Sequence, residues 1–177
     1  MRHFADRVSP LLTPGETAAF GPPDPPTAHT EAELAALVAL LASPQVGAAD
    51  IAVGHSRDAV SAAAAHALVE AWQAGAGRMV SAVVDWPEEA ASWLRPARRF
   101  AAPGPDAWVV AAAGRGWAQL SRRLRRDTGW EPGRTFGFAA AADPRTVALA
   151  GAGTLDGMRG ADADGTLWRV EGGWVVR

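Results

Sequence analysis

The stretch Asp50-Ile-Ala-Val-Gly-His-Ser56, followed at once by the alanine-rich segment 57–73, is the first of four strand-then-helix units that decide the fold of this chain. Each later unit has the same order, an apolar run and then a segment of helical character. These units occupy residues 78–85 with 88–102, 106–112 with 115–127, and 134–139 with a short helical piece after Pro144. Short apolar runs that alternate with helical segments are typical of βαβ units, whose strands lie parallel in one sheet.

The pattern predicts an α/β fold, a three-layer sandwich with a mostly parallel sheet of about five strands and helices on both faces. The fifth strand is expected within 154–160, and a C-terminal β-hairpin within 166–177. The strand at 78–85 is apolar almost throughout, which indicates that helices cover both of its faces. The chain is expected to form one domain, with a Pro-rich segment at 1–29 ahead of an α/β core at 30–160.

Local signals set the expected ends of the first elements. Pro14 and the proline-rich run 21–26 predict irregular structure before residue 30, apart from an edge strand over 4–12. Thr30 has a glutamate, Glu33, three residues later, which is the spacing of a capping box. We therefore expect a helix to begin there and to run to about residue 42.

Three further expectations concern charged and aromatic residues on the later elements. Glu88 favours the start of the helix 88–102, and Pro96 is expected to kink or end that helix. The arginines at 122, 123, 125 and 126 are expected to form a solvated helix face rather than an anion-binding patch. Trp168 and Trp174 on the hairpin are expected to form an exposed patch that offers a partner surface.

Composition narrows the class of protein. The chain has 177 residues, 49% of them hydrophobic and 20% charged, as in globular domains. A net charge of −2 gives no indication of nucleic acid or anionic membranes as partners. The absence of cysteine removes disulfides and thiolate metal sites, and we expect no metal and no cofactor. The N-terminus lacks the pattern of a secretory signal, and no apolar run suits a membrane span. The expected location is therefore cytoplasmic as written, or extracytoplasmic if the chain is a fragment of a longer precursor.

Several polar residues follow the predicted strands directly. Asp58, Asp85 and Asp143 each stand there, and ligands of open α/β sheets bind at that edge. Together the three carboxylates suit a cation, an amine or a sugar, whereas each alone is more readily a helix cap. Trp86 also follows a strand and is a candidate to line a cleft. Gly114-Arg-Gly116 opens a helix, whose N-terminal N–H groups can hold an anion.

The segment Val53-Gly54-His55-Ser56 raises the alternative of an enzyme. A strand that ends in Gly-X-Ser and opens a helix exposes the nucleophile in hydrolases and acyltransferases. Asp58 stands where that turn needs a small residue, and no histidine elsewhere in the chain is placed to act as the base. We therefore expect Ser56 to be an N-cap and expect no catalytic residue. A serine-nucleophile hydrolase or acyltransferase is the alternative, and a structural dimerisation module is the third possibility.

With these elements in order, residues 13–164 resemble one lobe of the type I periplasmic-binding superfamily, the Leu/Ile/Val-binding protein-like group. The order and spacing of several segments carry the resemblance: Thr13-Pro-Gly-Glu-Thr17, Ile51-Ala-Val-Gly-His-Ser-Arg-Asp58, Val80 to Trp86, Pro105-Asp-Ala-Trp-Val-Val110, Trp130-Glu-Pro-Gly-Arg-Thr-Phe-Gly-Phe138 and Leu155-Asp-Gly-Met-Arg-Gly160. Two features depart from the family. The sequence of the other lobe is missing, and Val60 and Ser61 stand where the family often has an aromatic residue and a glycine.

The resemblance implies a non-catalytic domain that binds or senses a small molecule. The positions that it places at the cleft, in the role of hydrogen-bonding a small polar ligand, are Ser56, Asp58, Asp85, Trp86, Arg115 and Asp143. One lobe alone leaves a ligand half solvated, so a homodimer or a partner subunit that supplies the second lobe is implied as well. No nucleic acid and no membrane is expected as a partner.

Overall fold

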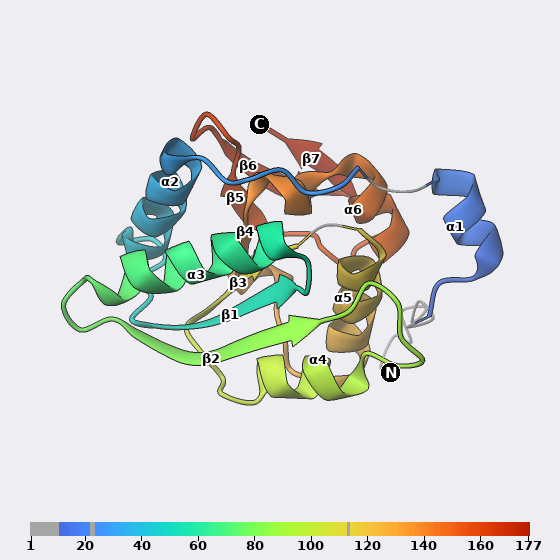
Figure 1. Cartoon of the computed structure of the whole chain (residues 1–177), viewed down its shortest axis with the longest axis horizontal. Coiled ribbons are helices and arrows are strands. Elements are labelled where there is room, and N and C mark those ends of the chain that lie inside the picture. Colours follow the sequence, from blue (N-terminus) through green and yellow to red (C-terminus); the bar gives the residue numbers. More distant parts are fainter. Residues whose placement is uncertain (1–10, 22–23, 113) are drawn as a thin grey trace, which may run out of the picture.

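A mixed β-sheet forms the centre of the computed structural model, which describes residues 11–21, 24–112 and 114–177 (Figure 1). Across these residues the sheet has seven strands in the order β2-β1-β3-β4-β5-β6-β7. The strands are β1 (Asp50–Ser56), β2 (Met79–Trp86), β3 (Ala107–Ala111), β4 (Thr135–Gly137), β5 (Arg159–Ala161), β6 (Leu167–Glu171) and β7 (Trp174–Val176). Strands β1 to β5 lie parallel, and β6 and β7 continue the sheet as an antiparallel hairpin. The predicted α/β class, the mostly parallel sheet and the terminal hairpin are confirmed.

Helices cover both faces of this sheet. On one face α2 (Glu31–Ala42) and α3 (Ala59–Gln73) bury Leu37, Leu41, Leu68 and Trp72 against β1, β3 and β4. The other face is covered by α4 (Leu94–Ala101), α5 (Arg115–Asp127) and α6 (Pro144–Ala150). Two short 3-10 turns, Pro132–Arg134 and Ala139–Ala142, flank β4. None of the helices in the described ranges has the length and apolar character needed to cross a membrane.

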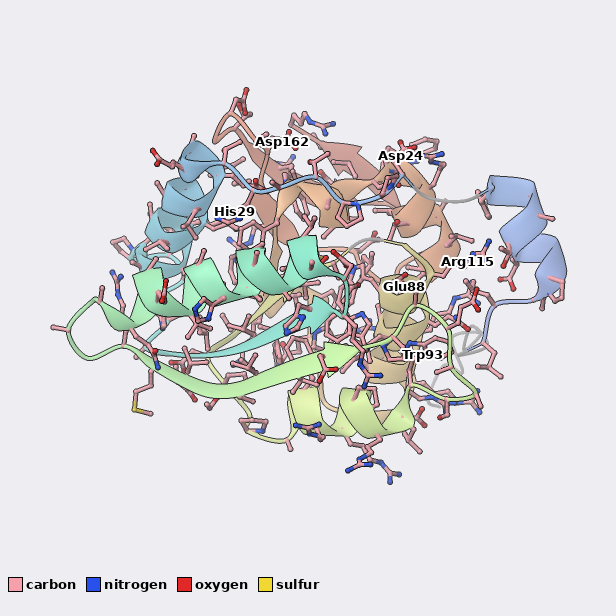
Figure 2. The ribbon with its side chains drawn as sticks, in the orientation of Figure 1. Asp24, His29, Glu88, Trp93, Arg115 and Asp162 are labelled. Atoms are coloured by element: carbon pink, nitrogen blue, oxygen red, sulfur yellow. The ribbon has the colours of Figure 1, made fainter. Side chains whose placement is uncertain are left out.

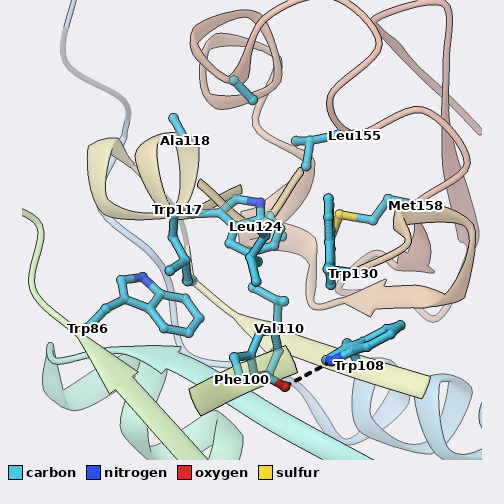
Figure 3. Close-up of a cluster of buried hydrophobic side chains, with 14 of the residues drawn as sticks. Trp86, Phe100, Trp108, Val110, Trp117, Ala118, Leu124, Trp130, Leu155 and Met158 are labelled. Carbon is cyan, nitrogen blue, oxygen red and sulfur yellow. Dashed lines mark hydrogen bonds between the residues drawn. The ribbon is translucent and has the colours of Figure 1, made fainter. Parts of the chain in front are cut away.

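Tryptophans dominate the core on the α4–α5–α6 face. Six of the eight tryptophans of the chain belong to this cluster, and each has at most 2% of its surface exposed. Trp86 stacks on Trp117 with ring centroids 6.0 Å apart, and Trp117 meets Trp130 edge to face at 6.1 Å. Figure 3 shows these rings together with Phe100, Leu124 and Met158 between the helices and the sheet. Large aromatic side chains thus provide much of the apolar area that this face buries.

Gly54 is the one position in β1 where the sheet and this cluster approach too closely for a side chain. A Cβ atom built there would lie 2.5 Å from the Trp86 ring and 2.9 Å from the Phe100 ring. Both rings belong to the buried cluster and are fully covered. The glycine of the Val53-Gly54-His55-Ser56 segment is therefore explained by packing.

The start of the chain is more regular than its prolines indicate. A helix, α1 (Pro14–Phe20), forms where irregular structure was predicted. Thr13 is its N-cap within a complete capping box with Glu16, and Pro14 occupies the first turn, where the missing N–H costs nothing. The capping box predicted for α2 at Thr30 and Glu33 is confirmed. The edge strand expected over 4–12 falls almost entirely outside the described residues.

The segment after β2 also differs from the prediction. The helix expected over 88–102 begins only at Leu94, so Glu88 lies in a loop and not at a helix start. Pro96 neither kinks nor ends that helix, because it lies in the first turn of α4, where proline is tolerated.

Among the described residues β2 pairs only with β1 and is therefore an edge strand. Val80 packs on the α2–α3 side and Val84 on the opposite side, as predicted, but the cover is incomplete, because Met79 and Val83 leave 60% and 48% of their surfaces exposed. Its apolar run resembles that of a central strand because position in the sheet is a property of topology, not of local sequence.

Two expectations about surface residues are wrong in part: Arg125 and Arg126 are exposed as expected, but Arg122 is not, and the two hairpin tryptophans differ. Arg122 is buried with 4% exposure, and its guanidinium donates to Glu16 Oε1 at 2.7 Å and to the Ala150 carbonyl at 3.2 Å. Trp168 is 2% exposed in the core, whereas Trp174 is 76% exposed, so the two do not form one patch. In the hairpin, successive side chains point to opposite faces of the sheet, and only one face packs on the core.

Candidate functional site

The carboxyl ends of β1, β2, β3 and β4 form one edge of the sheet, called here the rim. Ser56 at the end of β1 lies beside Trp86 at the end of β2, and His55 lies beside Ala111 at the end of β3. Figure 1 shows the arrowheads of β1 and β2 pointing toward this edge, with α1 standing beyond it. The parallel topology therefore gathers the residues that follow the strands, as the sequence predicted.

A carboxylate links three elements at the rim. Ser56 is fully buried, and its hydroxyl donates to Glu88 Oε1 at 2.6 Å. The other oxygen, Glu88 Oε2, accepts from the backbone N–H of Gly116 at 2.9 Å. Ser56 is thus not the N-cap that was expected; that role belongs to Asp58, which accepts from the N–H of Ser61 at 2.8 Å. Glu88 was not predicted as a site residue, because the sequence pattern placed it at the start of a helix. Its role as a bridge depends on contacts between three separate elements, which the local sequence does not reveal.

The Gly114-Arg-Gly116 turn makes room for this carboxylate. A Cβ atom at Gly116 would lie 2.8 Å from both Glu88 Oε1 and the Pro87 carbonyl, and one at Gly114 would lie 2.7 Å from Glu88 Oε2. The N-terminus of α5 favours negative charge, and Glu88 supplies it from within the chain. The anion position that the glycines predicted is therefore occupied by a residue of the protein itself.

The three aspartates of the rim have different partners. Asp58 and Asp143 are the N-caps of α3 and α6, as expected of each alone. Asp85 caps no helix and pairs with Arg57, whose guanidinium lowers the pKa of this carboxyl. Asp143 accepts from the N–H of Arg145 at 2.8 Å through Oδ1, while its Oδ2 is buried without a hydrogen-bond partner in the described structure.

The remaining two predicted residues lie in contrasting environments. Trp86 has no exposed surface and packs against Phe100 and Trp117, so it is a core residue and does not line a cleft. Arg115 is partly exposed and lies 3.7 Å from Glu89. It also faces α1 across an open depression lined by Leu12, Pro14, Thr17, Ala18 and Gly21. Figure 2 shows Glu88, Trp93 and Arg115 gathered beside α5.

A pocket on the α2–α3 side of the sheet contains none of the six predicted residues. Its cavity volume is about 20 Å³, and it lies at the ends of β3 and β4. Its apolar lining includes Val60, Ala64, Ala111 and Phe138, and its polar side chains are Thr27, His29, Glu33 and Ser61. We call this the Ser61 pocket. In Figure 2 His29 lies nearer α2, away from the Glu88 cluster.

The polar groups of the Ser61 pocket are held in different ways. Glu33 is 3% exposed and its carboxylate accepts from the backbone N–H groups of Thr30 and Ala139. His29 meets the Phe138 ring edge to face at a centroid distance of 5.9 Å. Ser61 is 3% exposed, and its hydroxyl has no hydrogen-bond partner in the described structure. A buried hydroxyl without a partner is energetically costly. The one sequence signal for it was that Val60 and Ser61 replace an aromatic residue and a glycine.

The chain is similar in structure to several solved receptors. A substrate-binding periplasmic protein from Ralstonia solanacearum aligns over 78% of this chain and 38% of its own, with 19% identity and a TM-score of 0.64. The leucine binding protein LivK from Thermotoga maritima aligns over 72% and 35%, with 18% identity and a TM-score of 0.57. An extracellular ligand-binding receptor from Rhodopseudomonas palustris aligns over 71% and 34%, with 18% identity and a TM-score of 0.58.

The chain thus spans little more than a third of the length of these proteins. No protein-family model and no curated protein sequence matches it. At these identities the likeness is one of fold. Its extent agrees with the resemblance found in the sequence, because about three quarters of this chain match little more than a third of each solved structure. The fold of this chain is that of one lobe of a type I periplasmic-binding protein.

Proposed function

We propose that this chain is a non-catalytic binding lobe that holds a small polar molecule in the Ser61 pocket, as one half of a two-lobed receptor or sensor. The observation that carries the proposal is the buried Ser61 hydroxyl, which has no hydrogen-bond partner in the described structure and belongs to a residue that lines this pocket. Ligand pockets combine an apolar lining with a few polar groups that orient the ligand, and this pocket has that composition.

The rim residues have supporting roles in this proposal. Asp58 positions Ser61 by accepting its backbone N–H at 2.8 Å. Arg115 and the Asp85–Arg57 pair are partly exposed at the rim and, in this proposal, face a second lobe. Ser56 and Glu88 hold the ends of β1 and α5 together, and Trp86 supports them from the core. The proposal includes a second lobe from a homodimer or a partner subunit; the solved structures are more than twice as long as the part they share with this chain. Because those relatives are periplasmic or extracellular proteins, the proposal includes an extracytoplasmic location.

The proposal also gives Ser56 no role as a nucleophile. Its hydroxyl is fully buried, and the hydrogen bond it donates goes to a carboxylate, not to an imidazole. A fluorophosphonate probe separates the two functions, because covalent labelling that is lost in Ser56→Ala would support the enzyme and contradict a binding lobe.

The test of binding uses leucine and the other neutral amino acids as probes, because one structural relative is a leucine binding protein. Thermal unfolding is followed in excess of each compound, where a ligand at 100 times its Kd stabilises the folded state by about 2.7 kcal/mol. Ser61→Ala should weaken binding roughly three- to tenfold, the effect of one hydrogen bond. The same substitution removes a buried group without a partner, so the unliganded protein should not lose stability.

Ser92→Ala is the matched control. Ser92 accepts a backbone N–H at the start of α4 and lies outside the pocket, so its loss should leave binding unchanged. A panel in which no compound stabilises the protein would remove the proposal, as would a Ser61→Ala variant that binds like the wild type.

A further inference from the structure

Among the described residues, the outer edge of β2 is the longest open edge of the sheet. β2 has eight residues and pairs there only with β1, whereas the opposite edge strand β7 has three. Between Met79 and Val84 the strand contains no charged residue and no proline, two of the means by which edge strands avoid pairing. Met79 and Val83 expose 60% and 48% of their surfaces along it. An edge of this length and character is suited to receive another strand.

The charged residues at the two ends of this apolar run indicate which partner strand can pair with the β2 edge. The apolar run is bounded by Arg78 at one end and Asp85 at the other. If a second copy of β2 pairs antiparallel with the first, Arg78 of each copy can stand opposite Asp85 of the other. The same register sets Met79 opposite Val84 and Val80 opposite Val83. Opposite-charge and apolar cross-strand pairs are those that stabilise antiparallel sheets.

A local irregularity in β2 makes this register possible. Two residues that lie opposite each other on neighbouring strands point to the same face of the sheet. Within a regular strand, two residues separated by an odd number of positions point to opposite faces, so this register would not fit a regular β2. The register with β1 shifts between Ile51 and Ala52, which leaves Ser81 as an extra residue. Val80 accordingly packs with the α2–α3 core and Ala82 with the opposite core. Beyond the shift, Val83 aligns with Val53 and therefore faces the same side as Val80.

The charged pair obeys the same geometry. Arg78 lies over the Trp72 ring at 4.5 Å, on the α3 side of the sheet. Asp85 aligns with His55, two residues after Val53, and so points to that side as well. Both ends of the run therefore present their charges on one face, as a two-fold axis perpendicular to the sheet requires.

We propose that two copies of this chain associate through their β2 edges, antiparallel, with Arg78 of each copy opposite Asp85 of the other. The pairing joins two sheets into one and leaves the Ser61 pocket, which lies at the ends of β3 and β4, outside the interface. This inference does not depend on the proposed function.

The first experiment measures mass by sedimentation over a range of protein concentrations. The wild type should approach twice the monomer mass as concentration rises. Val83→Lys should raise the dissociation constant by about tenfold or more, because a lysine on an edge strand opposes pairing. Val83 is 48% exposed, so this variant should fold, which circular dichroism verifies. Trp174→Ala, at the other edge, is the matched control and should dimerise like the wild type.

The second experiment tests the register. The chain contains no cysteine, so cross-linking reports only on introduced residues. Val80→Cys and Val83→Cys chains, mixed and oxidised, should form a disulfide-linked pair in higher yield than either variant alone. Opposed residues of antiparallel strands have Cα atoms about 4.5–5.5 Å apart, within the range that a disulfide spans. A protein that stays monomeric, a dimer that survives Val83→Lys, or a dimer lost in Trp174→Ala would each overturn the inference.

Discussion

The ion pair between Arg122 and Glu16 should anchor α1 to the rest of the protein. No residue of α1 is buried, so the helix has little apolar contact of its own. Arg122 on α5 has a side chain 3% exposed, and it donates to Glu16 at 2.7 Å and to the Leu11 carbonyl at 3.3 Å. Removal of the carboxylate in Glu16→Gln leaves a buried guanidinium with its charge less compensated, which is destabilising.

The magnitude follows from the titration of Glu16. Hydrogen bonding by Arg122 and by the Thr13 backbone lowers the pKa of Glu16 from 4.5 to about 2. This lowering of the pKa corresponds to a contribution of at most ~3 kcal/mol to the free energy of unfolding at neutral pH. Because the Glu16 side chain is 35% exposed, solvent screens the pair, and we expect about 1–2 kcal/mol.

The pH dependence has a definite sign. The pKa of Glu16 is lower in the folded protein than in the unfolded chain, so its contribution is fully present above pH 4.5 and is lost as the pH falls toward 2. Urea unfolding of wild type and Glu16→Gln, followed by tryptophan fluorescence, should therefore differ by about 1–2 kcal/mol at neutral pH and converge on acidification.

Arg123 provides the control for this experiment. It neighbours Arg122 and pairs with Asp127 at 2.9 Å across one helical turn. Such a pair contributes about 0.3–0.5 kcal/mol, so Asp127→Asn should cost much less than Glu16→Gln. Equal stability of wild type and Glu16→Gln at neutral pH, or a difference that grows in acid, would refute the role assigned to the buried arginine.

Two further predictions concern β1 and the rim. Gly54→Ala places a methyl group 2.5 Å from the Trp86 ring and 2.9 Å from Phe100. This overpacking should lower the free energy of unfolding by about 1–3 kcal/mol and therefore lower the urea midpoint. An unchanged midpoint would mean that the rings can move aside. Glu88→Ala leaves the buried Ser56 hydroxyl without its acceptor and should lower the free energy of unfolding by about 1–3 kcal/mol. A Ser56→Ala/Glu88→Ala double variant that is no less stable than Glu88→Ala would verify that the cost lies in that hydroxyl.

The parts of the fold that the sequence predicted are those encoded by nearby residues. The alternation of apolar runs with helical segments gave the parallel order, because each βα unit carries its own signal. The capping box at Thr30 and Glu33 located the start of α2, and the C-terminal hairpin lies within the predicted range 166–177, with Gly172 and Gly173 in its turn. In each case the residues that decide the structure lie within a few positions of one another.

The errors arose where distant segments decide the outcome. The burial of Arg122 depends on Glu16, which lies 106 residues away in the sequence. The edge position of β2 depends on which strands lie beyond it, and its apolar run alone does not reveal that. Glu88 has the composition of a helix start, yet the acceptor needs of Ser56 and the N–H of Gly116 hold it in a loop.

The two serines at the start of the first βα unit show the same principle for the candidate site. Ser56 ends a strand and follows Gly54-His55, the pattern that predicts a nucleophile or an N-cap. Ser61, five residues later, has a hydroxyl of the same chemistry within α3, and its sequence context gives no chemical motif. In the structure the Ser56 hydroxyl donates a hydrogen bond to Glu88, whereas the Ser61 hydroxyl has no hydrogen-bond partner in the described chain. Ser61 and not Ser56 is therefore the candidate for ligand contact. Whether a buried hydroxyl is free to meet a ligand depends on its tertiary neighbours, and a motif defined by local spacing contains no information about them.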